Sequence, residues 1–137
     1  MTLLERLNAN DHFAQSIGAR LVEVRPGYAR AELTVTDRHL NGAGVCQGGV
    51  MFTLADLTFA AVANSHGILS VGVSNHITYV KAGQLGDVLS AECTEQVDHR
   101  KLPYCDMRIT NQNGEVLAMM NGLGYRTSKP FEFESLM

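Results

Sequence analysis

Residues 39–65 read HLNGAGVCQGGVMFTLADLTFAAVANS, and the fold depends on this stretch. A polar, glycine-rich loop is followed by a segment whose apolar residues lie all round a helix of 3.6 residues per turn. This pattern predicts one long helix, from Gly48 to about Ser65, that is buried on most of its sides.

Asp56 is the only formally charged side chain between Arg38 and Lys81. A buried carboxylate costs several kcal/mol unless it is paired or protonated. Asp56 comes eight positions after Gly48, about two turns into the predicted helix, too far along to cap its start. We therefore predict a functional role for Asp56. Helical spacing places Gly49, Phe52, Thr53, Ala60 and Ala63 on the same face, where small residues would let a strand or a second subunit approach closely.

The flanking sequence predicts a short helix and six strands. A helix is predicted in the first ten residues, where Leu3, Leu4 and Leu7 share one face. One helix covers a large sheet only if the sheet curls around it, so we predict an α+β domain with a long central helix wrapped by a curved antiparallel β-sheet. The predicted strands are 17–25 and 28–36, which turn at Pro26-Gly27, then 68–80, 87–97, 104–112 and 115–127, with a hairpin at Asn113-Gly114.

Composition narrows the class of protein. A chain of 137 residues with 45% hydrophobic and 18% charged residues is typical of one ordinary globular domain. A net charge of -3 argues against nucleic acid as the main partner. No apolar run approaches the ~20 residues of a membrane span, and the polar start is unlike a signal peptide. Three cysteines without a CxxC pair predict free thiols in a reducing cytoplasm.

The loop GAGVCQGG lacks the spacing of a dinucleotide-binding GxGxxG motif, and no Lys-Ser/Thr of a phosphate loop follows. Two glycines at a helix start leave backbone N–H groups exposed in the positive potential of the helix dipole. Gly48 and Gly49 therefore predict either a site that holds an oxyanion or simply a tight turn into the helix.

Other polar residues allow two interpretations each. Asn41 and Gln47 could orient a water or a carbonyl, or they could stabilise their own loop. Ser74 or Asn75 could reach Asp56 from a strand packed on the helix, or could face solvent.

Three further groups of residues are of types that can bind metal, act as nucleophiles or hold phosphate. The five histidines show no HxxxH or HxH spacing, so no metal site is predicted. Cys46 has no His-Asn partner pattern and is expected to be a small buried residue. Arg100 and Lys101 lie in a predicted strand connection, where they could hold phosphates or form a solvated turn.

HLNGAGVCQGGVMFTLAD followed by FAAVANS resembles the hotdog-fold acyl-CoA thioesterases, in particular the phenylacetate-degradation branch with its motif N-G-x-x-x-x-H-G-G-x-x-F-x-L-A-D. The likeness runs from about residue 10 to residue 127 and includes ITYVKAG. It implies a single hotdog domain over residues 1–137, acting without a cofactor in the cytoplasm. It also implies hydrolysis of an acyl-CoA, such as phenylacetyl- or hydroxyphenylacetyl-CoA, to free acid and CoA.

The resemblance assigns roles residue by residue. Asp56 matches the catalytic carboxylate, which acts as general base or as nucleophile through an anhydride. Gly48 matches the glycine whose N–H polarises the thioester carbonyl, and Asn41 matches the amide that positions the carbonyl or the water. Ser74 falls where some relatives carry a Ser or Thr that assists the water.

Gln47 departs from this pattern, because the branch commonly has His there. A glutamine side chain still donates and accepts hydrogen bonds, but it does not titrate near neutral pH. Gln47 is therefore predicted to be a catalytic hydrogen-bonding residue without a protonation role. Substrate contacts are predicted for Gly49, Phe52, Arg100 and Lys101.

The resemblance further implies a homodimer with a continuous sheet, and a homotetramer built as a dimer of dimers. Asp56 of one subunit would then face Gly48 and Asn41 of the other. Two alternatives stay open. An acyl-CoA hydratase or dehydratase of the same fold would need a histidine acting with the carboxylate, and only His39 is near in sequence. A non-catalytic acyl-CoA-binding module would need an effector domain.

Overall fold

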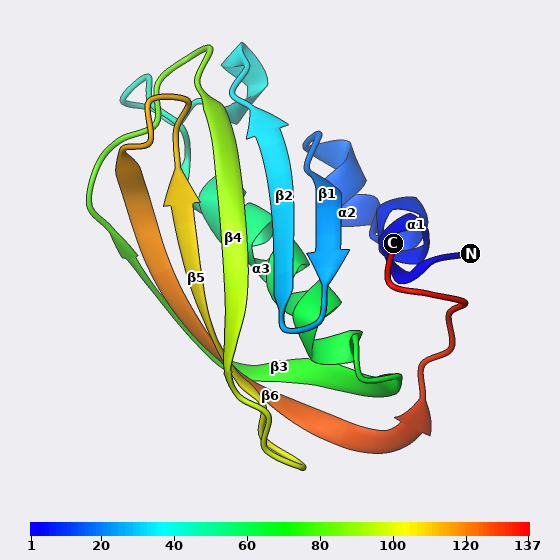
Figure 1. Cartoon of the computed structure of the whole chain (residues 1–137). Coiled ribbons are helices and arrows are strands. Elements are labelled where there is room, and N and C mark those ends of the chain that lie inside the picture. Colours follow the sequence, from blue (N-terminus) through cyan, green and yellow to red (C-terminus); the bar gives the residue numbers. More distant parts are fainter.

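One six-stranded antiparallel sheet curves around a single long helix, α3 (Gly48–Asn64), in the computed structural model, which describes all 137 residues (Figure 1). The strand order across the sheet is β1-β2-β4-β5-β6-β3. This architecture confirms the predicted α+β fold. The strands are β1 (Arg20–Arg25), β2 (Tyr28–Thr34), β3 (Ile68–Tyr79), β4 (Val88–Val97), β5 (Tyr104–Thr110) and β6 (Val116–Pro130).

The N-terminal segment contains more helix than predicted. Helix α1 (Leu3–Asn10) is present as expected, but α2 (His12–Ser16) and the short 3-10 helix η1 (Asp37–His39) were not predicted. Asp11 caps the start of α2, because its side chain accepts a hydrogen bond from the N–H of Ala14 at 3.0 Å. Strand β1 consequently starts at Arg20, and the predicted strand over 17–25 began too early.

Helix α3 forms because its sequence is free of proline and almost free of charge, and because Gln47 caps its start. The Gln47 Oε1 atom accepts the N–H of Gly49 at 2.5 Å. The helix ends before Gly67, which adopts a positive φ of 81°. Eleven of its 17 residues are buried against the sheet. None of the helices combines the length and apolarity needed to cross a membrane.

One side of α3 stays uncovered, and we call it the open face. Gly49 and Asp56 are exposed there, and Phe52, Thr53 and Ala60 are only half-buried. The expectation that Asp56 is buried is therefore wrong for the single chain. The sheet packs against the opposite side of α3, and Asp56 points away from it.

Strand β3 lies at one edge of the sheet and pairs only with β6. Its twelve residues form a long edge with unpaired backbone groups, and Val71 and Val73 expose 47% and 57% of their surface. Long edge strands with exposed apolar side chains are ready to pair with another chain. The fold thus leaves the β3 edge and the open face of α3 without a partner.

Leu54 of α3 is completely buried against the sheet and tests the described core. We expect Leu54→Ala to lower the free energy of unfolding by about 2–5 kcal/mol, because it removes buried methyl groups and leaves a cavity. Equilibrium urea unfolding at one fixed protein concentration measures the change. Leu85→Ala is the matched control, since Leu85 is 61% exposed and its loss should cost less than about 0.5 kcal/mol. Equal costs for the two variants would contradict the described core.

Candidate active site

The glycine-rich loop (residues 40–47) is held in place by backbone hydrogen bonds before α3 begins. Asn41 N–H donates to the Val45 carbonyl at 2.8 Å, and Cys46 N–H donates to the Gly83 carbonyl at 2.8 Å. The Asn41 Oδ1 atom accepts the N–H groups of Ala43 at 2.9 Å and Val45 at 3.3 Å. Asn41 therefore stabilises its own loop through its oxygen, while its Nδ2 has no acceptor within the chain.

The start of α3 leaves one backbone donor free. Gln47 Oε1 takes the N–H of Gly49, and the Gln47 carbonyl takes the N–H of Val50 at 3.0 Å. No acceptor within the chain takes the N–H of Gly48. This N–H lies at the positive end of the helix dipole, which favours negative charge on a bound oxygen. The free N–H is what the oxyanion interpretation of the paired glycines requires, and that interpretation stays a prediction.

Tyr79, which the sequence reasoning missed, packs on the same turn. Its hydroxyl donates to the Gly48 carbonyl at 2.9 Å. A Cβ added at Gly48 would lie only 2.8 Å from the Tyr79 ring. Gly48 has no positive φ, so the close approach of the ring, and not backbone conformation, accounts for a glycine at this position.

A mostly apolar hollow of about 470 Å³ opens beside this turn. Cys46 is buried at its wall, and burial raises the pKa of the Cys46 thiol to about 11. The thiol is therefore protonated at neutral pH and is no thiolate nucleophile, in line with the structural role predicted for it. The residues around the hollow include Asn41, Val45, Cys46, Gly48, Met51 and Tyr79.

Asp56 stands in the middle of the open face of α3 and makes no hydrogen bond or ion pair within the chain. Partial burial raises the pKa of its carboxyl above the usual range, and the negative charge of Asp11 raises it further. Asp56 comes eight positions after Gly48 in the helix, which is about 12 Å along the axis. The two groups of one chain are therefore too far apart to act on the same carbonyl.

Strand β3 does not bring Ser74 toward α3. Asn75 lies on the side of the sheet that faces the helix, because a Cβ at Gly122 would meet both Asn75 Oδ1, at 2.5 Å, and the Phe59 ring, at 3.0 Å. Side chains alternate along a strand, so Ser74 faces the other side of the sheet. No hydrogen bond joins Ser74 to Asp56, and the assisting role of Ser74 stays a prediction.

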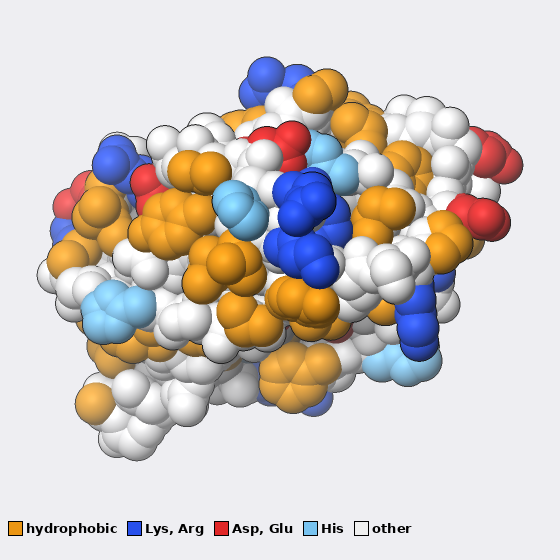
Figure 2. Space-filling model, turned by 90° about the horizontal axis from the view of Figure 1, so that it is seen from below, with side chains coloured by type: hydrophobic (Ala, Val, Ile, Leu, Met, Phe, Trp, Pro, Cys, Tyr) orange, Lys and Arg blue, Asp and Glu red, His pale blue; other side chains and the backbone are white.

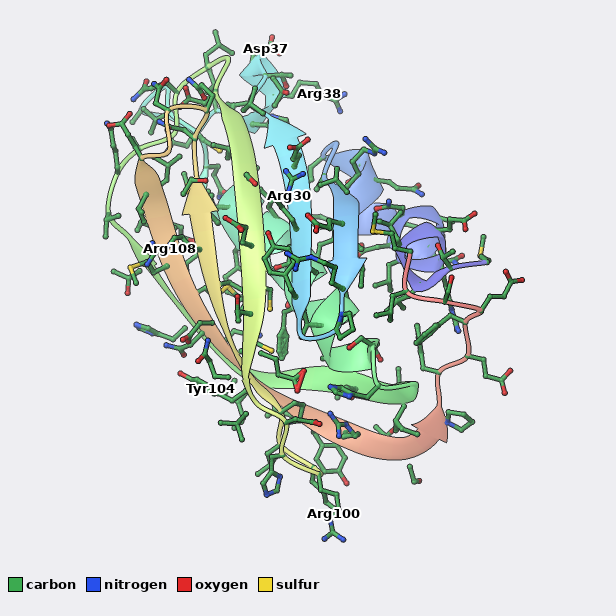
Figure 3. The ribbon with its side chains drawn as sticks, in the orientation of Figure 1. Arg30, Asp37, Arg38, Arg100, Tyr104 and Arg108 are labelled. Carbon is green, nitrogen blue, oxygen red and sulfur yellow. The ribbon has the colours of Figure 1, made fainter.

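Arg100 and Lys101 lie in the connection between β4 and β5, at the end of the sheet opposite to η1 and the glycine-rich loop (Figure 3). Together with Arg126 they border a hollow of about 330 Å³ near Ile68, just past the end of α3. Figure 2 shows Lys and Arg side chains gathered on this lower face among hydrophobic ones. The positive charge suits a phosphate-bearing group.

A second cluster near this end was not visible in the sequence. Ligand atoms of His66, Glu95 and Asp98 lie within 4.8 Å of one another, although His66 is 29 positions from Glu95 in the chain. His66 Nε2 contacts Glu95 Oε2 at 2.9 Å, and Asp98 accepts from the Arg126 guanidinium at 2.9 Å. Because the Arg126 cation already neutralises Asp98, the cluster is a network of polar contacts that ties the turn after α3 to the end of β4 and to β6.

Comparison with known proteins identifies the family of this chain. Residues 43–118 match the family model described as the thioesterase superfamily. Acyl-coenzyme A thioesterase PaaI of Escherichia coli is 35% identical over 119 residues, which cover 85% of this chain and 84% of that protein. A solved structure of E. coli PaaI, from the phenylacetic acid degradation operon, superposes with a TM-score of 0.86 at 30% identity, covering 96% of this chain and all of that one.

A hypothetical thioesterase protein of Streptococcus pneumoniae, solved with coenzyme A, gives a TM-score of 0.78 at 29% identity over 83% of this chain and 92% of that one. The fold and these matches define the class: the chain belongs to the thioesterase superfamily and has its hotdog fold. Within that class it is similar to the PaaI branch.

The raised pKa of Asp56 predicts how stability depends on pH. A carboxyl whose pKa is higher in the folded than in the unfolded chain stabilises the fold below the unfolded-chain pKa, and this contribution is lost as pH rises through the folded-state pKa. We therefore expect Asp56→Asn to melt at a higher temperature than wild type at pH 7. The difference should shrink toward about pH 4, where the wild-type carboxyl becomes protonated.

Asp98→Asn serves as a control of opposite sign. The hydrogen bond from Arg126 holds the pKa of Asp98 below its usual range, so its contribution is present at neutral pH and is lost on acidification. Asp98→Asn should therefore lower the melting temperature most at pH 7. If the difference in melting temperature between wild type and Asp56→Asn is the same at every pH, the described environment of Asp56 is contradicted.

Proposed function

We propose that this protein hydrolyses an aryl-acyl-CoA thioester, such as phenylacetyl- or hydroxyphenylacetyl-CoA, to the free acid and CoA. The observation that carries the proposal is the Gly48 N–H, which lacks an acceptor at the start of α3 beside an apolar hollow. Acyl-CoA thioesterase activity is supported by the likeness to PaaI, and binding of CoA by the likeness to the CoA-bound relative.

Each group has a defined part in the proposed reaction. The Gly48 N–H and the helix dipole stabilise the oxyanion that forms at the thioester carbonyl, and one such donor contributes about 10²–10³ in rate. Asp56 activates a water, for about 10²–10⁴ in rate, or attacks the carbonyl itself. Its raised pKa brings it closer to neutral pH, which suits a general base. In the general-base route, water attacks the carbonyl, CoA leaves as the thiolate, and the proton that Asp56 took from the water passes to that thiolate. In the nucleophilic route, the thiolate leaves behind a mixed anhydride on Asp56, which a water then hydrolyses to the free acid and the Asp56 carboxylate.

The proposed site needs two subunits, because Asp56 lies about 12 Å from Gly48 of its own chain. The open face of α3 and the unpaired edge of β3 support a homodimer in which the two sheets continue across β3. Asp56 would then face the Gly48 N–H and the Asn41 Nδ2 of the second copy. Pairs of dimers would form the proposed homotetramer.

The remaining predicted residues take supporting roles in this proposal. Arg100 and Lys101 would hold CoA phosphates together with Arg126. Gln47 keeps a free Nε2 donor while its oxygen caps α3, so it can still hydrogen-bond substrate. Gly49 and Phe52 would contact substrate on the open face. The side chain of Ser74 faces away from α3, so this geometry does not support the assisting role predicted for it.

No observation favours the hydratase alternative. His39 is buried, its Nε2 lies 2.7 Å from the Ile17 carbonyl, and its Nδ1 accepts the N–H of Thr36 at 2.9 Å. Both ring nitrogens are therefore occupied within the chain, and His39 is not available to act with Asp56.

The direct test is a hydrolysis panel with wild type and Asp56→Asn. Wild type should turn over phenylacetyl- and hydroxyphenylacetyl-CoA faster than medium-chain acyl-CoA. Asp56→Asn should lose at least about 100-fold in kcat while it still binds CoA, because the base is gone and the fold is kept. Crotonyl-CoA hydration, measured alongside, should be absent. Wild-type kcat in Asp56→Asn would refute the assignment of Asp56.

A subunit-mixing experiment tests the shared site. Asp56→Asn and Asn41→Ala are each expected to be inactive or nearly so, and they are mixed in equal amounts under conditions that allow exchange. Half of the dimers are then mixed, and one of the two sites in each has no mutated residue. Activity should rise toward a quarter of wild type. If exchange is demonstrated and activity does not rise, both residues serve the same subunit's site and the cross-subunit arrangement is wrong.

A further inference from the structure

Tyr79, the last residue of β3, contacts the first turn of α3. Its hydroxyl donates to the Gly48 carbonyl at 2.9 Å, and its ring lies against Gly48 so closely that a Cβ there would be 2.8 Å away. The contact spans 31 residues of sequence. No other side-chain hydrogen bond links this strand to the start of the helix.

The first turn of α3 needs such a contact. Two consecutive glycines, Gly48 and Gly49, give the backbone more freedom than any other pair of residues. Gln47 holds the N–H of Gly49 on one side, and Tyr79 holds the carbonyl of Gly48 on the other. These two side chains fix the peptide group between Gly48 and Gly49, and the N–H of Gly48 is left as the free donor.

The Tyr79 ring also forms part of the wall of the apolar hollow, next to Met51 and Val80. Tyr79 as a whole residue is 49% exposed in the single chain, so a bound group has room to lie against it. Partial burial raises the pKa of Tyr79 above its usual range, so the phenol keeps its proton and donates throughout the neutral range.

We propose that Tyr79 is a positioning residue of this thioesterase: its hydroxyl fixes the Gly48 turn for the thioester carbonyl, and its ring is the wall against which an aromatic acyl group packs. The inference rests on the proposed function, since it assumes that the carbonyl binds at the Gly48 N–H. It assigns the acyl group to the hollow beside Gly48. Aromatic pairs are worth more than their buried area alone, so the wall favours an aryl group over a short aliphatic one.

Two substitutions separate the two roles. Tyr79→Phe keeps the ring and removes the hydrogen bond, so it should lower kcat about 3- to 10-fold with both acetyl-CoA and phenylacetyl-CoA and leave both KM values within about twofold. Tyr79→Leu also removes the ring. It should give the same fall in kcat and, in addition, raise KM about 10-fold for phenylacetyl-CoA but not for acetyl-CoA.

Tyr28→Phe is the matched control. It also removes one phenol hydrogen bond, from Tyr28 to Glu92 at 2.5 Å, but between β2 and β4 and away from the hollow. Its kcat and KM should equal those of wild type. Unchanged kcat in Tyr79→Phe overturns the positioning role, and equal changes of KM for both substrates in Tyr79→Leu overturn the acyl wall.

A double-mutant cycle adds a readout that a general loss of stability would not move. Gly48→Ala should lower kcat more in wild type than in Tyr79→Leu, because the added Cβ collides with the ring that Tyr79→Leu removes. If the effects of Gly48→Ala and Tyr79→Leu on the logarithm of kcat simply add, the described packing of the ring on Gly48 is contradicted. Asp56→Asn in the same assay tests the proposed function separately: if it keeps full activity while the Tyr79 variants behave as expected, the carboxylate assignment fails and the role of Tyr79 stands.

Discussion

A single helix has to fill the concave side of a six-stranded sheet, and most other features of this protein follow from that constraint. Helix α3 buries eleven of its 17 residues, including Leu54 and Leu57, in one core with strands β1 to β6. The sheet must curve to cover so much apolar surface with so little helix. Even so, it reaches only one side of α3, which leaves the open face without cover.

That incomplete coverage links the fold to the proposed chemistry. Apart from Phe52, the residues on the open face are small or carry a carboxylate. The edge strand β3 is long, exposes Val71 and Val73, and has no partner on its outer side. A single chain therefore displays half of an arrangement: a carboxylate without a partner in the middle of α3, and a backbone donor without an acceptor at its start. In the proposed dimer, a second copy would supply what each group lacks, because pairing at β3 would bring the open face of one helix near that of the other.

The start of α3 combines freedom and restraint. Glycine at positions 48 and 49 allows a ring and a side-chain amide to approach the backbone very closely, to distances that no other residue permits. Gln47 and Tyr79 then hold the turn that the glycines would otherwise leave mobile. Gln47 stands where the resemblance leads one to expect histidine. Its observed role is to cap α3, and capping requires a hydrogen-bond acceptor but no group that titrates near neutral pH.

The sequence by itself determined the fold class, the bounds of α3 and of the four later strands to within a few residues, and Asp56 and the Gly48 turn as candidate site residues. These features are local: helical and strand periodicity, turn residues and a lone charge are all readable within short windows. Helix α2 was not predicted because its five residues are too few to show a clear helical periodicity.

Only the tertiary structure decided the exposure of Asp56, the contact of Tyr79 with Gly48, the outward orientation of Ser74, and the meeting of His66, Glu95 and Asp98. Each of these features depends on how segments many residues apart pack against one another. They depend on strand order, on the strand register and on which side of α3 the sheet covers, and no short window of sequence encodes those choices.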